Sequence, residues 1–408
     1  MTTQHIESKI KNYLDTYFTP NELTIMKKQY YHDYGYNDTT VYDPEYIVLS
    51  KLYKKLLNFV DDEKYRLEVD VNCRSLIKTI FERYVKKDTF VITTVEQHSS
   101  VQDLVRELDQ THTYKICIGG KEHLAPDLIK RILTAYKKTN CTNIVVLIPG
   151  VVPGFSYIFD QKIFECLKKE LVKSNIPHIL VLDDCQGILY TQRNYELFDI
   201  ITFTADTLFI GFKMGMLFTR LKQQLGYINK SGLKRFGEKL VILAKHKDKA
   251  MQFNSLMSEY FANSFNDAFQ PIVGVTPQYF TVQTSEVIVP REYADELVGN
   301  YRLTFNESNA PVSWFRARSH EAIIQQSDRF LSGLSRTKQI FEKLTRYREL
   351  NDKKIQQGDI LYKSFEDLNK CIYDIENAFY GYTDTRIIEQ AKYNNRHYIL
   401  DYYGQKLR

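Results

Sequence analysis

Short runs of apolar and β-branched residues alternate with longer amphipathic stretches between about residues 70 and 220. The runs predict strands at 89–95, 113–119, 143–150, 178–184, 199–204 and 215–219. The stretches between them carry apolar residues three and four positions apart, which predicts helices at 101–110, 125–140 and 160–175. Alternating strands and helices are typical of right-handed βαβ units, so we expect an α/β domain with a mostly parallel sheet flanked by helices.

The rest of the chain predicts three further parts. Residues 1–65 have mostly helical patterns and predict an N-terminal arm that could contact a partner subunit, ahead of a large domain over 66–260. Strand-like runs mixed with loops and helices over 261–350 predict a smaller C-terminal α+β domain. The polar and aromatic residues 351–408 predict a helical C-terminal extension.

Composition narrows the classes of protein that the chain can be. Of its 408 residues, 43% are hydrophobic and 26% charged, as in folded globular proteins, and the net charge of +5 does not indicate a nucleic-acid partner. The first residues do not have the pattern of a signal peptide, and no run approaches about 18 consecutive apolar residues, so we expect a cytoplasmic protein without a membrane partner. The six cysteines form no CxxC pair and no cluster with histidine, which predicts free thiols and no metal site.

One segment carries most of the functional information: DIITFTADTLFIGFKMGMLF, residues 199–218. It resembles, without gaps, the lysine-bearing strand and loop of class V aminotransferases and cysteine desulfurases, whose pattern is D-x-x-S-F-S-x-H-K-L-Y-G-P-K-G-x-G-x-L. These are pyridoxal-phosphate (PLP) dependent transferases of fold type I. The matching positions are Asp199, Phe203, Thr204, Leu208, Gly215 and Leu217. The register places Asp206 on the family's histidine and Thr207 on the lysine that forms the Schiff base.

Three other segments occur in the order that the same family has. VLDDCQG, 181–187, resembles the strand end that faces the cofactor ring, which implies that Asp183 pairs with the pyridine nitrogen and Gln186 with the ring hydroxyl. ITTVEQHSSV, 92–101, resembles the segment whose imidazole stacks on the ring; this implies His98, or Gln97 after a shift of one residue.

The third segment, VNCRSLIKTIFERY at 71–84, is placed where the family has a loop that opens a helix and holds the cofactor phosphate. The cofactor-binding residues implied by the resemblance are then Asp183, Gln186, His98, Thr204, Arg74 and Ser75. For the carboxylate of an amino-acid substrate, YRLTFNESN at 301–309 nominates Arg302, with Arg316 and Arg318 as rivals.

The segments also depart from the family where its chemistry takes place. A threonine at position 207 cannot form a Schiff base, and a register that makes Lys213 the reactive lysine loses the matches at Asp199, Phe203 and Thr204. Asp206 brings a carboxylate toward the phosphate, an effect that Arg74 could offset. IPGVVPG, 148–154, lacks the family's Asn-Glu pair, and no cysteine occurs between Cys185 and Cys371 to act as the persulfide-forming residue of a desulfurase.

Three hypotheses follow. The first is a PLP-fold enzyme acting on a small amino-acid-like ligand, with an unrecognised group in place of the lysine. The second is a pseudoenzyme that serves as a binding or structural subunit; the missing lysine argues against retention of PLP. The third is an unrelated α/β domain in which Asp183 and Asp184 hold a metal or a nucleotide. Because fold type I enzymes build their site at a subunit boundary, the resemblance implies a homodimer.

Overall fold

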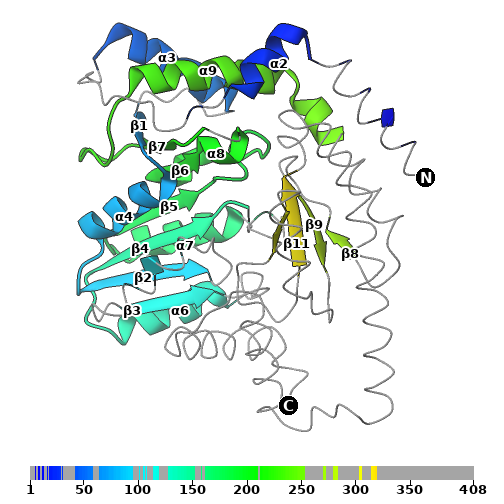
Figure 1. Ribbon diagram of the computed structural model, residues 1–408. Helices are drawn as coiled ribbons and strands as arrows, with labels where there is room; N and C mark the ends of the chain where they lie inside the picture. Colours follow the sequence, from blue (N-terminus) through cyan, green and yellow to red (C-terminus); the bar gives the residue numbers. More distant parts are fainter. Residues whose placement is uncertain are drawn as a thin grey trace, which may run out of the picture. The chain divides into compact units, whose positions relative to one another are not determined.

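The computed structural model describes residues 18–28, 42–57, 64–94, 114–118, 127–151, 161–209 and 212–252, four short later strands, and isolated residues elsewhere (Figure 1). It separates the chain into two compact units, one of residues Tyr17–Met251 and the other of Met1–Thr16 with Gln252–Arg408. The expected boundaries at 65, 260 and 350 remain predictions. In the described part of the chain, no helix is both long enough and apolar enough to cross a bilayer.

A seven-stranded sheet forms the centre of the first unit, with the strand order β1-β7-β6-β5-β4-β2-β3. Its strands are β1 (Arg66–Asp70), β2 (Thr89–Thr94), β3 (Tyr114–Ile118), β4 (Asn143–Pro149), β5 (His178–Asp183), β6 (Ile200–Thr204) and β7 (Gly215–Thr219). Five strands, from β6 to β3, run parallel, and β7 is antiparallel to both of its neighbours. The six predicted strands and the mostly parallel sheet are confirmed.

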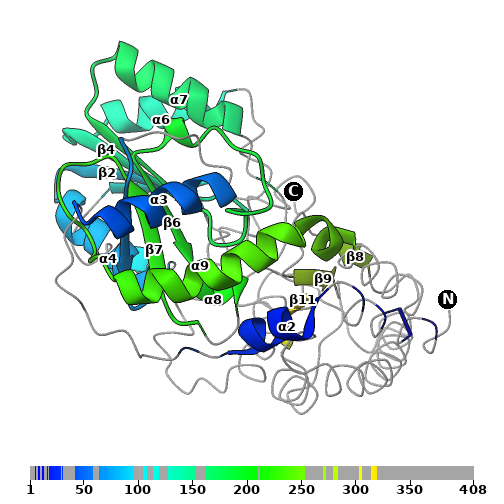
Figure 2. The same cartoon turned by 90° about the horizontal axis from the view of Figure 1, so that it is seen from above.

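Helices cover both faces of this sheet (Figure 2). They are α4 (Cys73–Tyr84), α6 (Leu128–Lys137) and α7 (Gln161–Lys173), and the last two confirm predicted helices. Successive residues of a strand point to opposite faces, so Val91 packs in the α4 core while Phe90 meets Tyr136 of α6, with ring centroids 5.7 Å apart. Most of the predicted helix at 101–110 lies outside the described residues; Val101 and Leu104 are buried.

The α4 face of the sheet holds one continuous apolar core. It contains Leu76, Ile77 and Ile80 of the helix and the inward residues of five strands, namely Val91, Leu147, Val181, Ile200 and Leu217. At the α4 end of this core, only glycine fits at position 215, because a Cβ there would lie 2.2 Å from the backbone carbonyl carbon of Asn72. The first turn of α4 is therefore held directly against the start of β7.

Three helices pack together beyond the β1 and β7 edge: α2 (Pro20–Lys27), α3 (Pro44–Leu56) and α9 (Lys230–Lys245) (Figure 1). Tyr53 of α3 packs against Phe236 of α9 with ring centroids 5.6 Å apart. The ammonium group of Lys239, which is fully buried, donates to the Met26 carbonyl at 2.9 Å and to the Lys28 carbonyl at 2.5 Å. Part of the sequence predicted as an N-terminal arm is thus fixed to α9.

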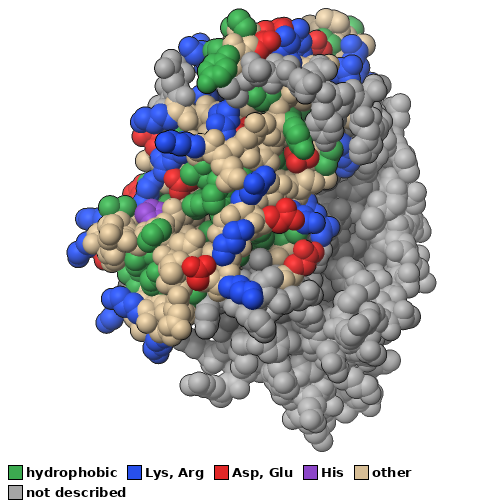
Figure 3. Space-filling model, turned by 90° about the vertical axis from the view of Figure 1, so that its left-hand side faces the viewer, with side chains coloured by type: hydrophobic (Ala, Val, Ile, Leu, Met, Phe, Trp, Pro, Cys, Tyr) green, Lys and Arg blue, Asp and Glu red, His purple; other side chains and the backbone are tan. Residues whose placement is uncertain are grey.

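The second unit contains a four-stranded antiparallel sheet with the order β10-β11-β9-β8. Its strands are β8 (Gln270–Ile272), β9 (Tyr279–Gln283), β10 (Leu303–Phe305) and β11 (Trp314–Arg318). They lie within 261–350, where the sequence predicted strand-like runs, whereas the predicted extension at 351–408 lies outside the described residues. On the face of the molecule in Figure 3, basic and acidic side chains are interspersed over the described part.

Candidate functional site

The candidate site lies at the carboxyl end of β5, the edge at which parallel sheets usually bind ligands. Asp183, the last residue of β5, is 7% exposed, and the Cys185 amide donates to its Oδ1 at 3.4 Å. Burial raises the pKa of the Asp183 carboxyl to about 6, and the thiol and amide of Cys185 offset only part of this rise. Among the described residues, no lysine or arginine forms an ion pair with Asp183. The site therefore contains a buried acid suited to a cationic or proton-donating partner.

Asp184 is buried as well, but it has a different role. The Tyr195 hydroxyl donates to its Oδ2 at 2.7 Å, and the Nε of Arg193 lies 3.3 Å from its Oδ1. Arg193 also donates to the Gly150 carbonyl, and a Cβ at Gly150 or Gly187 would lie within 2.3 Å of the Asp184 carboxylate. Asp184 thus joins the loops after β4 and β5.

Thr207 lies next to the turn that follows Asp183. It belongs to the one-turn helix α8 (Ala205–Leu208), which begins after Thr204 at the end of β6. The Thr207 hydroxyl oxygen is 2.5 Å from the Cys185 carbonyl oxygen and 2.9 Å from that of Thr204. A hydroxyl has only one proton to donate, and the two carbonyl oxygens already accept it. The Thr207 hydroxyl therefore has no further proton for a ligand. The Thr204 hydroxyl is likewise engaged, since it accepts from the Asp206 amide at 3.3 Å and donates to the Met214 carbonyl at 3.3 Å.

The charge of Asp206 is balanced locally. The Nζ of Lys213 lies 3.2 Å from its Oδ1, and the two side chains are partly exposed. Arg74, which the sequence suggested as the compensating charge, has its guanidinium 3.8 Å from the Glu107 carboxylate, and its effect on Asp206 stays a prediction. Lys213 thus supplies a positive charge of the kind that the sequence suggested Arg74 would supply.

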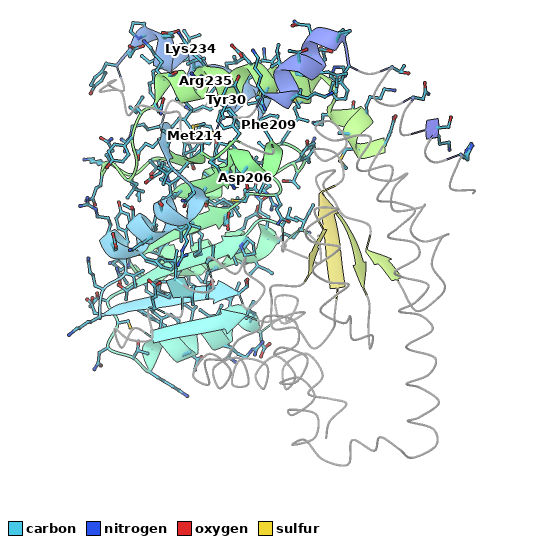
Figure 4. The ribbon with its side chains drawn as sticks, viewed as in Figure 1. Tyr30, Asp206, Phe209, Met214, Lys234 and Arg235 are labelled. Carbon is cyan, nitrogen blue, oxygen red and sulfur yellow. The ribbon has the colours of Figure 1, made fainter. Side chains whose placement is uncertain are left out.

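An aromatic cluster lies between α8 and α9, near Asp206 (Figure 4). The Lys213 amide donates to the Tyr30 carbonyl at 3.3 Å, and the Tyr30 ring packs on Phe212 with centroids 5.1 Å apart. Lys239 lies over the rings of Tyr30 and Phe209 at 5.4 and 5.6 Å, a range in which a buried cation is attracted to an aromatic face. These contacts fix the segment around Tyr30 against the loop that carries Lys213.

The start of α4, where the phosphate was expected, is already capped. Asn72 accepts at its Oδ1 from the Ser75 amide at 2.8 Å and from the Ser75 hydroxyl at 3.2 Å. The amide and the hydroxyl of Ser75, a residue that the sequence suggested for cofactor binding, are thus both engaged with Asn72. At the same helix end, the Sγ of Cys73 lies 3.5 Å from the Sγ of Cys185, and these two atoms and a carboxylate oxygen of Asp183 are all within 4.8 Å of one another.

The other site residues that the sequence suggested are described in part or not at all. Gln186 is 5% exposed in the turn after β5. His98, Gln97 and Arg302 lie outside the described residues, and of Arg316 and Arg318 only the backbone in β11 is described. Sequence reasoning missed the contact of Cys73 with Cys185 and the ion pair of Asp184. Strand alternation could have indicated that Asp184 faces away from Asp183.

No family model matches the sequence, and no curated protein does either. Solved structures do match. A NifS-like protein from Rickettsia africae has a TM-score of 0.55 and 12% identity, over 82% of this chain and 98% of that one. A serine palmitoyltransferase from Sphingomonas wittichii has a TM-score of 0.54 and 13% identity, over 83% and 86% of the two chains. The PLP-bound C–S lyase of Staphylococcus hominis has a TM-score of 0.53 and 11% identity, over 81% and 87%.

The chain has the fold of PLP-dependent fold type I proteins. The fold assumed in the third hypothesis, an unrelated α/β domain, is therefore wrong.

The described residues fit a bound PLP only in part. Asp183 is suitable as the partner of a protonated pyridine nitrogen, because it is buried and needs a cation or a proton donor. Thr207 offers no amine, Ser75 is engaged with Asn72, and the thiols of Cys73 and Cys185 lie against Asp183. These residues do not fit a covalently held cofactor.

Proposed function

We propose that this protein is a fold type I scaffold whose Schiff-base lysine is replaced by Thr207, and that it acts as a non-catalytic binding or structural subunit. The observation that carries the proposal is the position of Thr207. Its hydroxyl hydrogen-bonds to the turn directly after Asp183. In a fold type I enzyme, a lysine at this position would carry the amine that reacts with the cofactor whose ring pairs with the acid.

Chemistry supports the same conclusion. Schiff-base formation needs an uncharged amine as nucleophile, and a threonine hydroxyl cannot replace it. The nearest alternative in the sequence, Lys213, has its ammonium group 3.2 Å from Asp206. Lys213 is thus engaged with Asp206, and it is not the residue that the ungapped match places on the family's lysine.

The proposal is tested by adding PLP to the purified protein and recording absorbance between about 320 and 430 nm, where free and imine-bound cofactor absorb differently. The mixture is then reduced with borohydride, and lysine adducts are mapped by mass spectrometry. We expect no lysine of the natural protein to be labelled in stoichiometric amount. A stoichiometric adduct on any lysine, Lys213 included, would contradict the proposal.

Two variants make this test sharper. Thr207→Lys supplies an amine at the position assigned to the lysine, and a reducible adduct at residue 207 would support that assignment. Thr207→Ser is the matched control, because it keeps the hydroxyl that contacts Cys185 and Thr204 but adds no amine. We expect it to behave as the natural protein does.

A working enzyme is the second candidate, favoured by the buried Asp183 and the nearby Gln186. On this proposal the protein is cytoplasmic and binds PLP without a covalent bond. The bound PLP then reacts with a small amino-acid-like substrate. Retention of one cofactor per chain through gel filtration, lost in Asp183→Ala, would support the enzyme over the scaffold. Either candidate is proposed to be a homodimer, and light scattering on the eluting protein measures its mass directly.

A further inference from the structure

Three side chains from separate segments form a cluster of possible metal ligands at the candidate site. Cys73 is the first residue of α4, Asp183 is the last residue of β5, and Cys185 lies in the turn that follows. The two sulfur atoms are 3.5 Å apart, and one carboxylate oxygen of Asp183 is within 4.8 Å of both. The backbone holds this arrangement firmly, because Gly215 lets the first turn of α4 lie directly against β7.

The surroundings of the cluster favour a cation. Asp183 is 7% exposed, and the donors that face it are neutral: the amide of Cys185 at 3.4 Å, the thiol of Cys185 and the hydroxyl of Thr202. A buried carboxylate is costly unless a positive charge or several donors compensate it. Neither lysine nor arginine pairs with Asp183 in the part of the chain that the structure describes. The cluster thus has acceptor atoms but lacks the positive charge that would match them.

The types of ligand indicate which cation. Thiolate sulfur prefers zinc and similar soft ions, whereas magnesium and calcium prefer oxygen. Two thiolates bound tetrahedrally at about 2.3 Å place their sulfur atoms about 3.8 Å apart, so the observed 3.5 Å needs a shift of only about 0.3 Å. Three protein ligands also leave one coordination position open, and Cys185 is partly exposed. A small exogenous ligand could occupy that position.

We propose that Cys73, Asp183 and Cys185 bind one zinc-like divalent ion. On binding, two S–H bonds break, two metal–sulfur bonds form, and the two protons leave to solvent, with no change of oxidation state. The inference concerns only these three side chains, so it stands or falls separately from the proposed absence of a reactive lysine. Sequence spacing did not indicate this site, because Cys73 and Cys185 are 112 residues apart.

The test uses the full-length reduced protein, freed of metal with a chelator and dialysed against Zn²⁺. We expect one Zn²⁺ per chain. Cys73→Ser, Cys185→Ser and Asp183→Asn should each lose this equivalent, and Cys166→Ser, which changes an exposed thiol on α7, should keep it. If the natural protein binds no stoichiometric Zn²⁺, or if only Cys166→Ser loses it, the proposal is wrong.

A second measurement needs no variant and so does not depend on whether a variant folds. The natural protein is treated with a thiol-alkylating reagent with and without Zn²⁺, and the modified cysteines are mapped. Zn²⁺ should slow the modification of Cys185 and Cys73 but leave that of Cys166 unchanged. Equal protection of all three thiols, or none, would overturn the proposal. The proposal would also be overturned if the reduced protein binds no Zn²⁺ and forms a Cys73–Cys185 disulfide when hydrogen peroxide is added.

Discussion

Replacing Asp183 with asparagine should stabilise the metal-free protein at neutral pH. Burial raises the pKa of Asp183 from 3.8 to about 6, so the folded state disfavours the ionised carboxylate. A shift of about 2 pH units corresponds to about 3 kcal/mol of unfolding free energy. Asparagine has nearly the same shape and never ionises. The substitution therefore removes the cost of burying a charge. The net gain is smaller than this cost, because the hydrogen bond that the carboxylate accepts from Cys185 is weakened.

The sign follows from proton binding. Between about pH 4 and pH 6 the folded state binds more protons at Asp183 than the unfolded state does, so the stability of the natural protein falls as the pH rises through this window. This carboxyl is faced by the thiols of Cys73 and Cys185, the Cys185 amide and the Thr202 hydroxyl, and Asp184 adds a repulsive charge. The advantage of Asp183→Asn should therefore be close to zero near pH 4 and reach up to about 3 kcal/mol above pH 6.

Urea denaturation in the presence of a chelator measures this difference, at about pH 4.5 and about pH 7.5. Asp184→Asn is the matched control, since it changes the neighbouring buried carboxylate. It leaves the Arg193 guanidinium, 3% exposed, without its counter-charge and should cost about 3–5 kcal/mol. If Asp183→Asn destabilises the protein at pH 7.5, or stabilises it equally at both pH values, the reasoning about the uncompensated acid is refuted.

Two further variants test how the site is supported. Gly215→Ala should destabilise the protein by about 3 kcal/mol in urea titrations, because its Cβ would meet the Asn72 backbone at 2.2 Å; an unchanged midpoint would mean that α4 can move away freely. Lys239→Met keeps the length of the side chain but loses the hydrogen bonds to the Met26 and Lys28 carbonyls, which should cost about 3 kcal/mol and speed hydrogen exchange in α2. Unaltered exchange there would contradict this role.

Sequence patterns predicted the centre of the sheet well, because strands buried on both faces consist of apolar and β-branched residues. They missed β1, whose sequence RLEVD has charged residues at alternate positions. In the structure, Glu68 is fully buried, forms an ion pair with Arg66 and accepts from the amides of Leu225 and Gly226. No pattern of hydrophobicity reveals a buried glutamate whose two amide donors, Leu225 and Gly226, lie more than 150 residues away.

The candidate site was predictable only where it depends on neighbours in sequence. The motif around residues 199–218 led to Thr207, and the structure brings this residue beside the end of β5. The contact of Cys73 with Cys185 joins segments 112 residues apart, and the contact of Asp184 with Arg193 depends on how the turn after β5 folds. Arg74 was matched to Asp206 from charge alone, and its position on α4 next to Glu107 could not be read from the sequence.

The central claim is that Thr207 has replaced the reactive lysine and that no other lysine has taken its role. Borohydride reduction of the natural protein with one equivalent of PLP, followed by peptide mapping, tests it most directly. We predict no lysine labelled in stoichiometric amount in the natural protein and a specific label at residue 207 in Thr207→Lys. A stoichiometric phosphopyridoxyl group on Lys213, or on any other lysine of the natural protein, would contradict the account.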